Sequence, residues 1–147
     1  MAYHLAISIY GPGTDPNHRS HWGFLIYKPG ENVGDLLHTP VIDLTRLWYQ
    51  FEERSGVPVV SKQSAGRFKI ATLTENQRQA VKLIIKAEPP PRDGKKKCQD
   101  WVLDTIISLE VEELVEAGTA ERVGHFVGKP AVEVAEMIGE DWIAAIA

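Results

Sequence analysis

The order of hydrophobic patterns along the chain is the feature that most limits its fold. Residues 3–10, 21–28 and 67–73 alternate apolar with other side chains at a period near two, which is typical of half-buried strands. In the second half, apolar residues recur at helical spacing instead. Strands followed by helices favour an α+β fold. We therefore expect an antiparallel sheet of four to six strands packed on two or three helices.

Two further segments are weaker strand candidates. Residues 35–44 contain Pro40 in their middle, which predicts an edge strand or a bulge because proline cannot donate to a central ladder. Residues 48–53 fit either a strand or a helical turn, and we prefer a strand.

Start and stop signals define three helices. A capping box at residues 74–77 begins a helix that we expect to end near Ala87, before three prolines. A second helix begins at Cys98 and is expected to end near Gly118, and a last one begins at Pro130. The side chains expected to seat these helices are Val81, Leu83, Ile84 and Ile85; Cys98, Trp101, Val102, Thr105, Ile106, Leu109 and Val115; and Val132, Val134, Ala135, Met137 and Ile138.

Composition narrows the class of protein. With 147 residues, 44% of them hydrophobic, we expect one domain over residues 1–147 that needs no disulfide or metal to be stable. A single cysteine and an N-terminus without a signal-peptide pattern favour a reducing, cytoplasmic location. No apolar run approaches the roughly 18 residues of a membrane span, and a net charge of −4 disfavours nucleic acid as a partner. The oligomeric state stays open.

Cys98 is the candidate nucleophile. It lies in the first turn of a helix directly after three lysines, and both the helix dipole and the cations favour a thiolate. The alternative is a small, buried, inert side chain. Cysteine chemistry also needs a base and a group that orients it. His21 begins one predicted strand and His38 lies on the next, so antiparallel pairing can bring them together, although each alone fits an ordinary strand residue.

Several short motifs together carry a family resemblance. Residues 20–26 read Ser-His-Trp-Gly-Phe-Leu-Ile, residues 37–38 read Leu-His, and residues 98–102 read Cys-Gln-Asp-Trp-Val. In this order, on two strands and a helix start, they resemble the circularly permuted papain-like fold. The closer likeness is to the NlpC/P60 and lecithin:retinol acyltransferase-like group, and residues 48–53 are similar to an uncharacterised fungal branch of it. The resemblance covers residues 21–114.

The resemblance implies a mechanism. Cys98 would be the nucleophile, His21 its general base and acid, and His38 the group that orients His21, with a backbone N–H near Cys98 as an oxyanion donor. The implied activity is hydrolysis or acyl transfer on an amide or ester, through a thioester and without a cofactor. The acyl substrate would be a small molecule or a peptide. Lys97 departs from the asparagine that the family commonly carries before its cysteine.

Other polar and aromatic residues have weaker claims. Trp22, Trp101 and Gln99 neighbour the proposed catalytic residues and are candidates for substrate binding, although core packing is the favoured role of both tryptophans. Asp100 and Asp104 fit a solvated helix face, and no histidine and cysteine spacing matches a zinc site. The competing function is a catalytically silent domain that binds a partner protein. A redox-sensing thiol is a third candidate, but it lacks a second cysteine.

Overall fold

One antiparallel sheet of six strands organises residues 2–15, 18–60 and 64–144, which the computed structural model describes. The strand order is β6-β3-β2-β1-β7-β8, and every neighbouring pair is antiparallel. This confirms the predicted α+β class and the antiparallel sheet. The strands of the sheet are β1 (Tyr3–Tyr10), β2 (His21–Tyr27), β3 (Val33–His38), β6 (Glu52–Pro58), β7 (Ser64–Leu73) and β8 (Trp142–Ala144).

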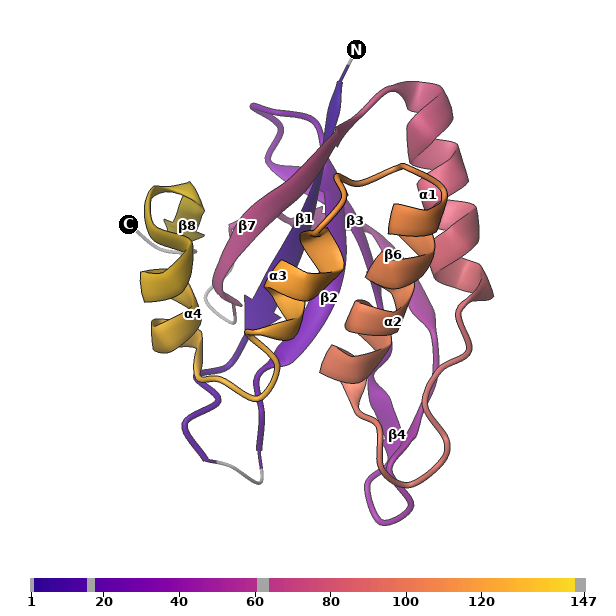
Figure 1. Ribbon diagram of the computed structural model, residues 1–147, viewed down its shortest axis with the longest axis vertical. Coiled ribbons are helices and arrows are strands. Elements are labelled where there is room, and N and C mark those ends of the chain that lie inside the picture. The colour runs from indigo at the N-terminus through magenta and orange to yellow at the C-terminus, as the bar shows by residue number, and fades with distance from the viewer. Residues whose placement is uncertain (1, 16–17, 61–63, 145–147) are drawn as a thin grey trace.

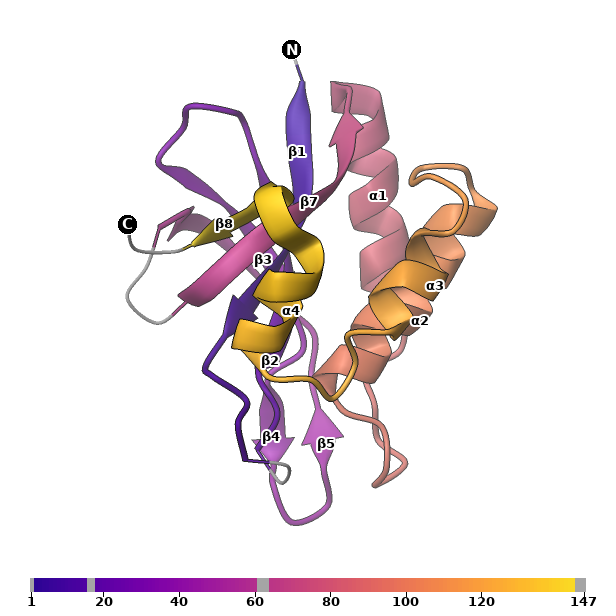
Figure 2. The same ribbon diagram turned by 60° about the vertical axis from the view of Figure 1, so that its left-hand side comes forward.

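The helices cover one face of this sheet (Figures 1 and 2). A separate two-stranded hairpin projects beyond the sheet at the end where the helix of Cys98 begins. The helices are α1 (Glu75–Ala87), α2 (Cys98–Val111), α3 (Thr119–Gly124) and α4 (Ala131–Ile138), and the hairpin consists of β4 (Val41–Asp43) and β5 (Trp48–Tyr49).

Strand alternation divides the apolar residues between two cores. On β2, Trp22, Phe24 and Ile26 face the helices and join the main core, which includes side chains of all four helices. Leu25 and Tyr27 point to the opposite face and belong to a smaller cluster there. Because side chains alternate across a strand, His21 shares this second face with Leu25.

The capping box predicted for the first helix is present. The backbone N–H of Gln77 donates to Thr74 Oγ1 at 3.2 Å, and the N–H of Thr74 donates to Gln77 Oε1 at 2.8 Å. Val81 and Ile85 are buried as expected, but Leu83 is 70% exposed. The prediction was wrong for Leu83 because the helix buries only a narrow stripe against the core.

Helix α2 ends earlier than Gly118. Glu113 adopts the left-handed conformation, with φ of 58°, although glycine is the usual residue there. The N–H of Leu114 then donates to the carbonyl of Leu109, and that of Glu113 donates to Glu110, which completes a Schellman motif. Gly118 instead precedes α3, a short helix that the sequence did not reveal.

The two weaker strand predictions needed correction. Pro40 interrupts residues 35–44, so β3 ends at His38 and β4 begins at Val41. β3 is not an edge strand, because it pairs with β2 on one side and β6 on the other. The alternative expectation, a bulge, agrees with the register shifts between Gly34 and Leu36 and between Val41 and Asp43. Residues 48–53 form parts of two strands rather than one, since the chain leaves β5 at Gln50 and enters β6 at Glu52.

The C-terminal part was predicted only in outline. α4 begins directly after Pro130, and Val134 and Ile138 are buried, but Val132 and Met137 are exposed. A short 3-10 turn, Gly139–Asp141, then leads into β8, which pairs with β7 and was not predicted. A strand of three residues is too short to produce a periodic signal.

Neighbouring isoleucines on α2 test the assigned core. Ile106 is fully buried, whereas Ile107 is 47% exposed. We expect Ile106→Ala to lower the free energy of unfolding by about 2–5 kcal/mol, because it leaves a cavity in a packed core. Ile107→Ala should cost less than about 1 kcal/mol. Urea unfolding followed by circular dichroism measures both, and equal losses would contradict the assigned helix face.

Candidate active site

The candidate site lies where the first turn of α2 meets the start of β2. Cys98 is the first residue of α2, and its Sγ lies 3.9 Å from the carbonyl oxygen of Ser20. The backbone N–H of Trp22 also donates a hydrogen bond toward this sulfur. The sulfur therefore contacts the backbone on both sides of His21.

Gln99 fixes this junction. Its Nε2 donates to the carbonyl of Ser20 at 2.9 Å, and its Oε1 accepts from the N–H of Gly128 at 2.7 Å. The side chain is fully buried, so both ends of the amide are used inside the protein. Gln99 thus joins α2, the start of β2 and the loop before α4.

The two predicted histidines meet across neighbouring strands. His21 Nε2 lies 2.8 Å from His38 Nδ1, and the other nitrogen of His38, Nε2, lies 3.1 Å from Oε1 of Glu52. The register explains this contact, because His38 pairs with Gly23 on β2 and with Glu52 on β6. The sequence predicted that strand pairing would bring His21 and His38 together, and the structure confirms it.

Gly23 makes room for His38. A Cβ atom at Gly23 would lie 2.9 Å from the Cβ of His38 and 3.0 Å from Cδ1 of Leu36. Real Cβ atoms do not approach a neighbour that closely. A side chain at this position would therefore push His38 away from His21.

Burial controls the charge state of both proposed catalytic groups. Burial is the main cause that lowers the pKa of His21 to about 4, and the repulsion that His21 would meet if both rings were protonated is the second cause. Burial also raises the pKa of the Cys98 thiol, against backbone hydrogen bonds that lower it. At neutral pH the resting pair is therefore an uncharged imidazole and an uncharged thiol.

This result corrects the thiolate expected from the three lysines. Lys96 Nζ lies 2.8 Å from Asp104, so its charge is already paired. Asp100 accepts from the N–H of Lys97 at 2.8 Å and places a negative charge near the sulfur. Asp100 therefore caps the start of α2, and Asp104 pairs with Lys96. The two residues do more than form the solvated helix face expected from the sequence.

Two tyrosines flank the site. The ring of Tyr10 lies 5.9 Å from that of His21, its partner in the β1–β2 ladder. Tyr49 is buried, and its N–H donates to Pro91 in the loop that leads to Cys98. Burial is the main cause that raises the pKa of Tyr49 to about 12, and repulsion from Asp100 and from Cys98 once that thiol is ionised at high pH adds to it. Tyr49 therefore stays a neutral phenol beside the nucleophile.

The three predicted substrate-binding residues have buried positions. Trp22 is fully buried in the main core, and Trp101 packs edge-on against Phe24, with its Nε1 donating to the carbonyl of Glu88. Gln99 has both ends of its amide occupied. These three buried side chains pack beneath the protein surface next to the site, and they present no open surface to a substrate.

Two site residues were missed in the sequence. Glu52 contacts His38, and Tyr49 lies near Cys98, but both fall in residues 48–53, which were read as one strand. The alternation of Glu52 and Glu53 was the available signal, since a strand must direct adjacent carboxylates to opposite faces. Glu53 indeed contacts Lys82 and Lys86 on α1.

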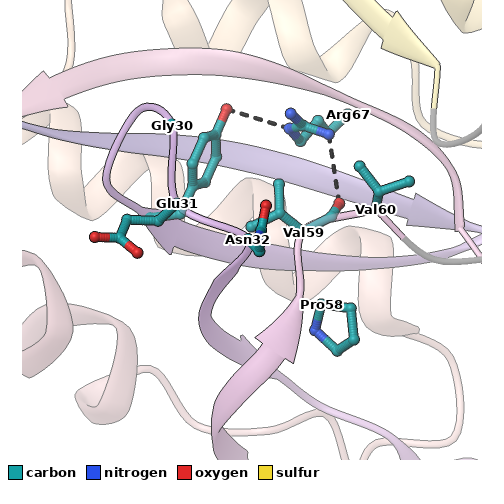
Figure 3. A pocket seen from close by; sticks show the side chains of 8 residues that line it. Gly30, Glu31, Asn32, Pro58, Val59, Val60 and Arg67 are labelled. Carbon is teal, nitrogen blue, oxygen red and sulfur yellow. Dashed lines mark hydrogen bonds between the residues drawn. The ribbon is translucent and has the colours of Figure 1, made fainter.

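A hollow of about 510 Å³ lies near the other end of β2 (Figure 3). The guanidinium of Arg67 spans it by donating to the hydroxyl of Tyr27 at 3.2 Å and to the carbonyl of Val59 at 3.4 Å. Cys98, His21 and His38 are not among the residues that line it. This hollow is therefore separate from the candidate site.

The described ranges contain neither a metal-binding cluster nor a membrane-spanning helix. Within residues 2–15, 18–60 and 64–144, no group of three or more histidine, cysteine, aspartate or glutamate side chains is placed to hold a metal ion. In the same ranges, no helix combines the length and apolar character that a bilayer crossing requires.

The role of Gln99 is testable by stability. We expect Gln99→Leu to lower the free energy of unfolding by about 1–3 kcal/mol, because it leaves the carbonyl of Ser20 and the N–H of Gly128 without their partner. Gln79→Leu, on the exposed face of α1, is the control and should change stability by about 0.5 kcal/mol or less. Urea midpoints compare the two, and an unchanged midpoint in Gln99→Leu would contradict the clamp.

Comparison with known proteins gives one match. No curated protein and no solved structure matches the chain. The model of a family of unknown function, DUF6540, matches residues 7–116, a range that includes Cys98, His21, His38 and Glu52 and ends before α3. Because the match covers more than half of the 147 residues, the chain belongs to the DUF6540 family of unknown function.

Proposed function

We propose that this protein is a cysteine-dependent hydrolase or acyltransferase acting on an amide or ester. The observation that carries the proposal is the 2.8 Å contact between His21 and His38, made directly beside the backbone that Cys98 touches. A nucleophile at a helix start, a histidine and a second group bound to that histidine form the arrangement that acyl transfer requires.

The order of elements supports a permuted papain-like fold. Two histidine strands precede the cysteine helix, and the helices lie on one face of an antiparallel sheet. Lys97 occupies the N-cap position of α2, and its backbone N–H donates to Asp100 at 2.8 Å, so the helix starts at Cys98 although asparagine is not the preceding residue.

The chemistry starts from a neutral pair. His21 Nε2 faces His38, so Nδ1 is the nitrogen that accepts the thiol proton in this proposal. The resting sulfur contacts the carbonyl of Ser20, and it must turn toward Nδ1 as it attacks the acyl carbonyl. The carbonyl oxygen gains negative charge near the N–H groups of the first α2 turn. The leaving amine or alcohol departs with the proton held by His21, and a thioester remains. His21 then takes a proton from water or an acceptor amine, which attacks the thioester and restores the thiol.

A second candidate is a catalytically silent domain that binds a partner protein. The observation in its favour is the burial of Cys98, which is 7% exposed and has a raised pKa. A substrate carbonyl reaches this sulfur only if neighbouring groups move.

Acylation separates these two candidates. We expect the wild-type protein to form a Cys98 thioester with an activated p-nitrophenyl ester, detected as a mass increase of the intact chain. Cys98→Ala should form none, and His21→Ala should slow acylation by about a hundredfold or more, because the general base is lost. His125→Ala, at an exposed histidine, is the control and should match the wild type. A folded wild-type protein that is never acylated would support the silent domain.

The dependence of the acylation rate on pH in the acidic range tests whether His21 is the general base. His21 acts only when unprotonated, and its pKa lies near 4. The rate should therefore be steady above about pH 5 and fall about tenfold per pH unit below pH 4. Circular dichroism at each pH confirms that the protein stays folded. A midpoint near 6.5 would show that a solvated histidine is the base instead.

A further inference from the structure

We propose that Glu52 is a positioning residue that fixes which nitrogen of His38, and through it which nitrogen of His21, carries the proton. Its effect on chemistry rests on the proposed function of Cys98. The proton positions themselves belong to the resting protein and can be measured without a substrate.

Three adjacent strands place these groups in a line. His38 lies between Gly23 of β2 and Glu52 of β6 in the two ladders. Oε1 of Glu52 lies 3.1 Å from His38 Nε2, and His38 Nδ1 lies 2.8 Å from His21 Nε2. The carboxylate and the two imidazoles thus follow one another across β6, β3 and β2 at this end of the sheet.

The charge on Glu52 sets the direction of both hydrogen bonds, the one to His38 and the one between the two histidines. An ionised carboxylate can only accept hydrogen bonds, so His38 Nε2 must carry the proton that faces Glu52. A neutral His38 then has a lone pair on Nδ1 and accepts from His21 Nε2. A neutral His21 with its proton on Nε2 has its own lone pair on Nδ1. This is the form that can accept the proton of a thiol.

Without the carboxylate, the opposite direction becomes accessible. His38 can then hold its proton on Nδ1 and donate it to His21 Nε2. His21 must in that case carry its proton on Nδ1, and that nitrogen can then no longer accept the proton of a thiol. Removal of Glu52 therefore weakens the base without touching the nucleophile.

The surroundings of Glu52 favour this role over a general structural one. The side chain of Glu52 is about half exposed, at 47%, so folding does not depend on its burial. Arg54 Nε lies 3.7 Å from the same carboxylate oxygen. Glu53, one residue further on, is directed to α1 and contacts Lys82 and Lys86, which makes it a matched control on the same strand.

Nitrogen NMR of the imidazoles, with ¹⁵N-labelled histidine at pH 7, tests the proposal directly. In the wild type we expect both His21 and His38 to hold the proton on Nε2. Glu52→Ala should shift both rings toward the Nδ1–H form, whereas Glu53→Gln should leave them unchanged. Glu52→Gln, whose amide can accept as well as donate, should show an intermediate shift and serves where Glu52→Ala does not fold. Unchanged tautomers in folded Glu52 variants would overturn the proposal.

Acylation of Cys98 supplies the second measurement. We expect Glu52→Ala to lower the maximal acylation rate at least about tenfold with KM unchanged, and Glu52→Gln to recover part of it. A shift of tautomer with no change in this rate would overturn the positioning role. If the wild type is never acylated, the proposed function fails, and the tautomers still show whether Glu52 directs the two histidines.

Discussion

The junction between the first turn of α2 and the start of β2 determines the geometry of everything around it. Gln99 binds the carbonyl of Ser20 and the N–H of Gly128 from inside the protein. Cys98 is the next residue back along the helix, so the same two hydrogen bonds that hold Gln99 also place the sulfur against β2. The clamp is buried, and water cannot replace it without opening the core.

Burial at this junction decides the chemistry. The helix start favours a thiolate, but it acts on a group that is largely withdrawn from water. Desolvation opposes charge on Cys98 and on His21 alike, which raises the pKa of one and lowers that of the other. A neutral pair costs less to bury than a thiolate and an imidazolium. Proton transfer must then accompany attack on the substrate, rather than precede it.

Much of the fold could be predicted from local sequence signals, and the errors in that prediction have local causes. The alternation of residues 3–10 and the capping box at Thr74 predicted β1 and α1 correctly. The end of α2 was missed because Glu113 adopts a backbone conformation that usually marks glycine. The single strand expected over residues 48–53 hid a change of sheet between Tyr49 and Glu52, since a break of two residues leaves no periodic signal.

The candidate site shows where such prediction ends. Residue types and their positions in the sequence were enough to select Cys98, His21 and His38, because nucleophilic catalysis requires a thiol and an imidazole base. Their relation to Glu52 depends on register, and a shift of one residue in the β3–β6 ladder would direct Glu53 toward His38 instead. Lys86 would then lose this carboxylate, and Lys82 would keep only its contact with Asp35. The ion pairs of Glu53 with α1 on one face and the contact of Glu52 with His38 on the other are thus two results of the same backbone register.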